Sequence, residues 1–274
     1  GLTSELVALD ARTGDTRWSR RLGEESVRWI MGLPAVAGGR VYAGSAMSVH
    51  AFDAGDGTER WRHDLGPEDI SPSWSGVAAD ADTVVLGASA QALHLIALDA
   101  PSGEVRWRHS GRDLAGVTVT PVIAGDLVLA AHGPGWVRAY SIADGETRWK
   151  AALDEAWPVA LAVDGAGAIV RSAKGTISAH DLADGVARWT CALGPGPRSA
   201  RPYSRPPGGT RAPLVIAGGA AWTSVFDEVV AIDLESGQVV QRPRMDTEIG
   251  TIVADGEAVI AVTVNGDAVR LRPS

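Results

Sequence analysis

The stretch ALDARTGDTRW, residues Ala8 to Trp18, decides the fold, because this eleven-residue motif occurs six times in the 274-residue chain. We call the motif the phrase. Each copy follows the pattern Ala-x-Asp-x-x-x-Gly-x-x-x-Trp, with Ser141 in place of Asp in the fourth copy and Gln241 in place of Trp in the sixth. The repeated glycines are Gly14, Gly57, Gly103, Gly145, Gly185 and Gly237, and the repeated tryptophans are Trp18, Trp61, Trp107, Trp149 and Trp189. Successive glycines are 43, 46, 42, 40 and 52 residues apart, which is the length of one four-stranded propeller blade.

Within a repeat unit the residues read as short strands. Alternating segments such as PAVAGGRVYAGS, SVHAFD and TERWRHDL are rich in β-branched and aromatic residues and are separated by Gly, Asp and Asn corners. The glycine of the phrase can adopt a positive φ and return the chain in a tight hairpin, and the aspartate can accept hydrogen bonds from the turn. The alanine is small enough for a large ring to lie against the backbone, and the tryptophan brings that ring and an indole N–H. The phrase is therefore expected to staple blades together.

The sequence predicts an all-β fold, a single β-propeller domain over residues 1–274 in which four-stranded antiparallel blades form one ring. Complete units are expected at residues 28–65, 70–110, 114–153, 156–194 and 203–243. Residues 1–22 supply two further strands and residues 246–272 about three. If these ends share a blade the ring has six blades, which we favour; if each belongs to its own blade it has seven. Because the chain begins inside a repeat, we expect it to be part of a longer protein with a covalently linked upstream domain.

Composition narrows the function classes. A formal net charge of −8 argues against nucleic acid as a partner, since that affinity rests on Lys and Arg neutralising phosphates. No apolar run is long enough to span a membrane, and no signal peptide is visible, so the cellular compartment stays open. The single cysteine, Cys191, leaves no pair for an intramolecular disulfide. Only Lys150 and Lys174 accompany 23 arginines, which suggests a bacterium of high GC content.

The six-fold phrase resembles the tryptophan-docking repeat of PQQ-like β-propellers. That family includes quinoprotein dehydrogenases, the assembly lipoprotein BamB and propellers joined to actinobacterial Ser/Thr kinases. The resemblance covers essentially the whole chain and holds in five of the six copies. In the sixth copy Gln241 replaces the tryptophan, so that copy is not expected to dock on its neighbour. It implies that the family's enzymes use a quinone, a calcium ion, a catalytic Asp and adjacent cysteines. None of these can be placed on this sequence, so no PQQ, other cofactor or metal is expected.

Five tryptophans lie outside the repeat, and four of them belong to the candidate site. Alignment of the units places Trp29, Trp74 and Trp157 at or before first strands and Trp136 between a second and a third strand, so these four are expected around one mouth of the channel. The remaining one, Trp222, is expected in the core. Charged residues in the same inter-blade segments complete the candidate set for a ligand or partner: Arg28, Glu68, Arg112, Glu155 and Glu248. Aromatic rims with convergent polar groups build small-molecule pockets and protein hot spots, although such tryptophans can also merely cap blade ends.

Catalytic signals are weak. The sequence has no G-x-S-x-G elbow, Walker loop or H-E-x-x-H motif, and its six histidines have no ligand spacing, which favours structural roles. Adjacent acidic residues such as Glu68 and Asp69 could serve as a general acid and base, so an enzyme with its active site at the channel mouth is a further hypothesis. The insertion at residues 194–213 carries four arginines and no acid; it reads as a solvated loop, with a lid over the mouth or an arm toward an acidic partner as alternatives.

The sequence thus favours a non-catalytic propeller that recognises a small molecule or a protein. We expect the sensor domain of a bacterial signalling protein such as a Ser/Thr kinase, by analogy with the family, since fold alone does not determine function. The alternative is a BamB-like assembly scaffold that gathers other proteins. An enzyme that uses the channel mouth is the third hypothesis.

Overall fold

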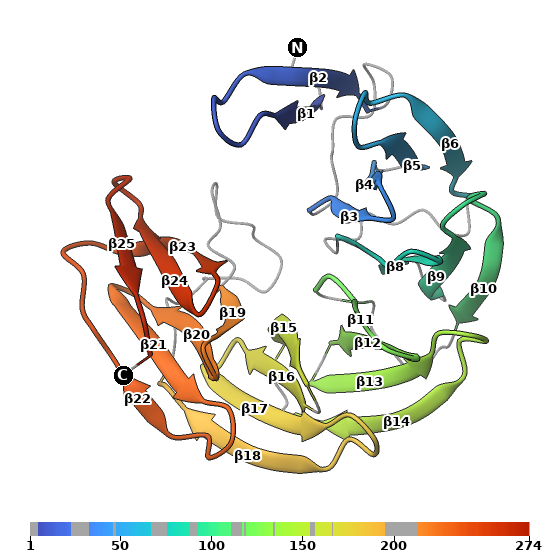
Figure 1. Ribbon diagram of the computed structural model, residues 1–274. Helices are drawn as coiled ribbons and strands as arrows, with labels where there is room; N and C mark the ends of the chain where they lie inside the picture. The colour runs from blue at the N-terminus through green and yellow to red at the C-terminus, as the bar shows by residue number, and fades with distance from the viewer. Residues whose placement is uncertain are drawn as a thin grey trace. The chain divides into compact units, whose positions relative to one another are not determined.

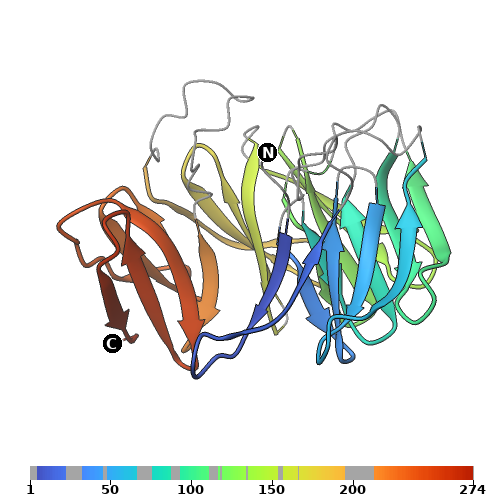
Figure 2. The same ribbon diagram turned by 90° about the horizontal axis from the view of Figure 1, so that it is seen from above.

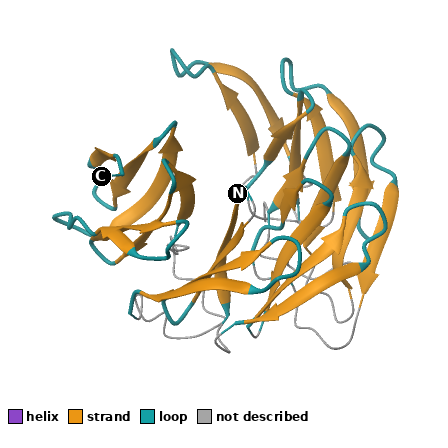
Figure 3. Ribbon diagram, turned by 60° about the horizontal axis from the view of Figure 1, so that its bottom comes forward, coloured by secondary structure: helices purple, strands orange, loops and turns teal. Residues whose placement is uncertain are grey.

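The computed structural model describes residues 5–22, 33–45, 48–66, 76–87, 93–110, 117, 119–133, 135–153, 157–165, 167–194 and 213–273. Strands make up all its regular structure, and no helix occurs in these ranges (Figure 3). No described segment therefore forms a helix that is long and apolar enough to cross a membrane.

Each of the five complete repeat units forms one four-stranded antiparallel sheet with its strands in chain order (Figure 1). The strands are β3 (Ala35–Ala37), β4 (Arg40–Gly44), β5 (Ser48–Asp53) and β6 (Glu59–Asp64); β7 (Val77–Ala79), β8 (Thr83–Gly87), β9 (Leu93–Asp99) and β10 (Val105–Ser110); β11 (Val122–Ala124), β12 (Leu127–His132), β13 (Trp136–Ser141) and β14 (Thr147–Ala152); β15 (Pro158–Asp164), β16 (Gly167–Ser172), β17 (Thr176–Asp181) and β18 (Ala187–Ala192); β19 (Leu214–Ala217), β20 (Ala220–Val225), β21 (Glu228–Asp233) and β22 (Val239–Gln241). The predicted unit boundaries enclose these five sheets.

Two incomplete sheets stand at the chain ends. The N-terminal one pairs β1 (Glu5–Leu9) with β2 (Thr16–Arg21), and the C-terminal one joins β23 (Ile249–Asp255), β24 (Ala258–Thr263) and β25 (Ala268–Leu271). The expected two and three strands are thus present, each set in a sheet of its own. That the two ends share one blade stays a prediction.

The chain divides into two compact units, residues 1–133 with 138–148 and residues 134–137 with 149–274. The boundary passes through β13 and β14. In the first unit, the sheets β3–β6 and β7–β10 stand side by side (blue to green in Figure 2). The single propeller domain over the whole chain stays a prediction.

The repeated tryptophans dock on the next copy of the phrase. The indole N–H of Trp61 donates to the carbonyl of Ala100 at 2.9 Å, and its ring lies on Gly103, which has a φ of +76°. The same arrangement recurs for Trp18, Trp107, Trp149 and Trp189, with Gly57, Gly145, Gly185 and Gly237 beneath the rings. The glycine therefore has a second role beyond the turn, because only a residue without a side chain admits the ring.

The phrase also carries an ion pair that sequence reasoning missed. The carboxylate of Asp53 accepts a hydrogen bond from the Gly55 backbone N–H at 2.9 Å, as expected for the turn, and its other oxygen meets the Arg60 guanidinium at 2.7 Å. The Arg60 hydrogen bond is the main cause that lowers the pKa of Asp53 below its ordinary value. Equivalent pairs, seven residues apart, join Asp10 to Arg17 and Asp99 to Arg106.

The hydrophobic cores lie between neighbouring sheets of each unit. Tyr42 and Val49 pack against Ile96 and Leu98 in the first unit, and in the second unit one face of β20 and β21 packs on β16 and β17. The other face of β20 carries Trp222, which is fully buried against the β23–β25 sheet, so the prediction of a core role for this residue is confirmed.

Candidate functional site

Three of the predicted mouth residues lie in the described part of the chain: Trp136, Trp157 and Glu248. The other six, Arg28, Trp29, Glu68, Trp74, Arg112 and Glu155, lie outside the described residues, as does the arginine-rich insertion from residue 195 to 212.

The three residues share one end of their sheets. Trp157 immediately precedes β15, Glu248 immediately precedes β23, and Trp136 is the first residue of β13 rather than a residue of the loop before it. In a four-stranded antiparallel sheet, the start of the first strand, the turn between the second and third strands and the end of the fourth strand all lie at one end. We call this the connection end; the docking phrases occupy the opposite end.

Both tryptophans at the connection end are half-buried, and Glu248 is exposed. The ammonium of Lys150 lies 5.7 Å from the ring centroid of Trp136, a cation–π distance. The carbonyl of Trp157 accepts a hydrogen bond from the Ala173 N–H at 2.9 Å, which ties the residue to the end of β16. The Trp136 ring and the Trp157 backbone are thus each tied to their own sheet, while part of both residues stays in contact with solvent.

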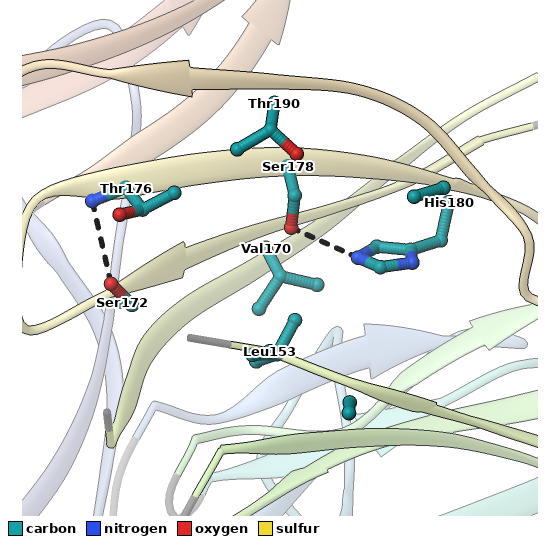
Figure 4. A pocket seen from close by; sticks show the side chains of 9 residues that line it. Leu153, Val170, Ser172, Thr176, Ser178, His180 and Thr190 are labelled. Atoms are coloured by element: carbon teal, nitrogen blue, oxygen red, sulfur yellow. Dashed lines mark hydrogen bonds between the residues drawn. The ribbon is translucent and has the colours of Figure 1, made fainter. Parts of the chain in front are cut away.

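A cavity of about 200 Å³ lies between the end of β14 and the sheet β16–β18, within the second unit (Figure 4). Val170, Ser178 and His180 point into it, and Leu153 lies across from Val170. The other lining residues are Ala152, Ser172, Thr176, Ala187 and Thr190. None of these side chains carries a permanent charge.

Hydrogen bonds determine which nitrogen of the cavity histidine, His180, carries the proton. The Nδ1 atom of His180 lies 3.1 Å from the Gly185 carbonyl, which can only accept, so Nδ1 carries the proton. The Nε2 atom then accepts from the Ser178 hydroxyl at 2.9 Å. Burial lowers the pKa of His180 below its ordinary value, and this effect outweighs the hydrogen bond to Gly185. The imidazole is therefore neutral at pH 7.

A second histidine joins a serine and an acid in the first unit. The Nδ1 atom of His50 lies 2.7 Å from the Glu59 carboxylate, and its Nε2 atom lies 2.7 Å from the Ser48 hydroxyl. This order resembles a hydrolase triad, yet Ser48 is only 1% exposed and its hydroxyl also bonds that of Ser45. The chain of hydrogen bonds therefore ties β5 to β6, in line with the structural role expected for the histidines.

Arg171 on β16 is a buried cation that makes no ion pair with another residue in the described part of the chain. It is 2% exposed, its guanidinium donates to the Thr223 hydroxyl, and its Nε has no hydrogen-bond partner. Burial lowers its pKa to about 10, so it stays protonated at neutral pH. Nothing in the sequence distinguishes this arginine from the exposed ones, because its burial depends on β20 of the next sheet.

Metal ligands do not gather in the described part of the chain. No group of three or more His, Cys, Asp or Glu side chains there is arranged to hold a metal ion.

Comparisons with known proteins agree with the repeat. A family model described as outer membrane protein assembly factor BamB matches residues 2–110 and 45–274. The solved structure of BamB from Moraxella catarrhalis matches with a TM-score of 0.71 and 18% identity, covering 98% of this chain and 78% of that one. These matches, together with the sheets described above, establish the fold as a multi-blade β-propeller.

Two dehydrogenases are also similar. The quinohemoprotein alcohol dehydrogenase from Comamonas testosteroni matches with a TM-score of 0.60 and 16% identity, covering 89% of this chain and 46% of that one. Subunit 1 of methanol dehydrogenase [cytochrome c] from Paracoccus denitrificans is 36% identical over 67 residues, 21% of this chain and 11% of that protein. The chain thus spans less than half the length of either dehydrogenase.

Proposed function

Because this chain belongs to the family of the outer membrane protein assembly factor BamB, with its PQQ-like propeller repeat, we propose that it is a non-catalytic scaffold that binds other proteins. The observation that carries the proposal is the match of the assembly-factor model along the whole length of the chain. The proposal includes no quinone and no metal, and it assigns no reaction to the chain.

The relatives favour this scaffold over the kinase-linked sensor that composition and the family analogy suggested. The family model that matches the chain is described as an assembly factor, one of the three relatives is BamB and the other two are dehydrogenases. We therefore place the scaffold first and keep the sensor as a further hypothesis.

The connection end is the proposed partner surface. Trp136 and Trp157 present part of each indole there, and tryptophan is among the residues that contribute most to protein interfaces. The Trp136 ring already lies against the Lys150 ammonium, so little of its side-chain entropy would be lost on binding.

Site-specific photo-crosslinking of the full-length protein in its native host tests this proposal. A photoreactive amino acid replaces Trp136, Trp157 or, as the matched control, Val186, an exposed residue in the docking phrase at the opposite end. Discrete crosslinked partners are expected from the two tryptophan positions and not from Val186. Crosslinks from Val186 alone, or equally from both ends, would contradict the proposed surface.

Affinity for the crosslinked partner gives the magnitude. Truncation of a tryptophan hot spot costs about 2 kcal/mol or more, which is about thirtyfold in affinity. Trp136→Ala and Trp157→Ala are each expected to weaken binding by at least that factor, whereas Val186→Ala leaves it unchanged. Unchanged affinity in both tryptophan variants would remove the connection end from the interface.

A further inference from the structure

The cavity beside β17 borders two positions whose residues differ between the repeats. These positions lie one and three residues before the aspartate position of the phrase, and their side chains point toward the preceding sheet. They hold Ile96 and Leu98 in β9 and Val230 and Ile232 in β21, all fully buried in hydrophobic cores. They hold one polar or charged residue and one aromatic residue in two other sheets, His50 with Phe52 in β5 and Arg138 with Tyr140 in β13. In β17 the same two positions hold Ser178 and His180.

The two polar residues are as deeply buried as the residues they replace. His180 is 3% exposed and Ser178 is 8% exposed. Large aliphatic side chains at these positions would fill the space and gain the hydrophobic stabilisation that β9 and β21 obtain there. Departures from local packing rules of this kind are expected at functional sites, because stability is given up there for another purpose.

We propose that the cavity binds a small, neutral polyhydroxyl molecule. Its wall offers the hydroxyl oxygens of serine and threonine residues on one side and the apolar surfaces of Val170 and Leu153 on the other (Figure 4). Polyols have the matching character, since hydroxyl groups both donate and accept hydrogen bonds and the C–H groups between them are apolar.

The hydrogen-bond directions in the wall suit such a ligand. The Ser178 hydroxyl gives its proton to His180, so its oxygen is left to accept from a ligand hydroxyl. The hydroxyls of Thr176 and Thr190 make no hydrogen bond to another described residue and are available as donors or acceptors. A charged ligand would lose its hydration without meeting an opposite charge, because no charged side chain lines the cavity.

Size and access set further limits. A volume of about 200 Å³ lies between the roughly 150 Å³ that admits benzene and the roughly 300 Å³ at which drug-sized pockets begin, so the ligand has about six to twelve non-hydrogen atoms. Ala152, Ala187 and Thr190 are exposed and mark the opening, which lies along the outermost strands β14 and β18. Neither Trp136 nor Trp157 lines this cavity, and the proposal does not depend on the proposed scaffold function.

Trp149 provides a local reporter. Its ring lies on Gly185, whose carbonyl accepts the Nδ1 proton of His180. The indole N–H signal of Trp149, assigned with Trp149→Phe, is therefore followed by ¹H–¹⁵N NMR during titration with glycerol, myo-inositol and, as the charged probe, glycerol 3-phosphate. A saturable one-to-one shift is expected with at least one neutral probe and not with the phosphate.

Two variants make the test specific. Ala187→Leu fills the opening and is expected to weaken binding of the neutral probe at least tenfold, whereas Thr147→Leu, an exposed residue at the same place in the preceding repeat, leaves it unchanged. Ser178→Ala is expected to weaken binding as well, with the indole spectrum otherwise preserved. Shifts that rise linearly with every neutral probe, saturation only by the phosphate, or equal affinity in Ala187→Leu and Thr147→Leu would each overturn the proposal.

Discussion

Substitution of a docking glycine tests whether the tryptophan staple stabilises the first unit. In Gly103→Ala the new Cβ would lie 2.6 Å from Cδ2 of the Trp61 ring, a distance that real Cβ atoms do not show. The ring must move, and its hydrogen bond to the Ala100 carbonyl is then strained or lost. Gly39 is the matched control in the same unit, because its φ is +72° against +76° at Gly103 and a Cβ there would meet nothing within 4 Å.

Gly103→Ala and Gly39→Ala share the backbone contribution to destabilisation and differ in the contribution from side-chain packing. Forcing alanine into a left-handed conformation costs about 1–2 kcal/mol at either site. Only Gly103→Ala adds overpacking against Trp61, about 1–3 kcal/mol, and the weakened indole hydrogen bond, about 1 kcal/mol. Gly103→Ala should therefore destabilise the protein by about 2–4 kcal/mol more than Gly39→Ala.

Urea unfolding followed by circular dichroism and tryptophan fluorescence measures this difference as a free energy of unfolding. A double-mutant cycle assigns it to the ring: in a Trp61→Val background, Gly103→Ala should cost no more than Gly39→Ala does. Equal costs of the two glycine variants in the wild-type background, or an excess that persists without Trp61, would refute the docking argument. Gly14→Ala adds a second control, since Gly14 holds the same place in the phrase with nothing near its Cβ position.

Three further outcomes are expected. Trp222→Ala should lower the free energy of unfolding by about 3–5 kcal/mol, because it empties a fully buried site and removes the indole donor to the Ala217 carbonyl; a loss below about 1 kcal/mol in urea unfolding would contradict this packing. Arg171→Met should leave the melting temperature unchanged or raise it, because a buried cation without a carboxylate partner among the described residues is replaced by an apolar chain of similar length; a clear fall would show that the guanidinium has a partner in solution. Because burial lowers the pKa of His180, the unfolded chain binds a proton at higher pH than the folded one, so the stability is complete above about pH 6.5 and decreases as the pH falls below it. His180→Gln should flatten this part of the stability profile, and an unchanged slope between about pH 6.5 and 5 would mean that His180 is not its source.

The repeated phrase predicted most of the secondary structure but only part of the tertiary contacts. Its period predicted the five four-stranded sheets and the two incomplete ones, and its glycines take the positive φ expected of the turn. It also pointed to an acceptor for the indole N–H without identifying it. The ring lies on the glycine of the following copy, about 40 residues along the chain, and no local pattern contains that contact.

The candidate site was predicted less completely. Trp157 and Glu248 lie at the connection end as the unit alignment required, and Trp136 lies there as the first residue of its strand. The cavity around Ser178 and His180 was not predicted, although the aligned repeats contain a signal for it. Comparison of the aligned positions sets these two polar side chains against aliphatic pairs in β9 and β21, while β5 and β13 each combine one polar or charged residue, His50 or Arg138, with an aromatic one.

The sequence by itself determined the period, the strand and turn pattern and the residues of the staple, because backbone conformation and hairpin chemistry depend on neighbours within a few positions. Only the tertiary structure decided which glycine lies beneath which tryptophan, that Arg171 is buried beside Thr223, and that Ser178 and His180 border a cavity. These features arise where one sheet packs on the next. Packing joins side chains about 40 residues apart, and its outcome depends on their combined volume, which no single repeat contains.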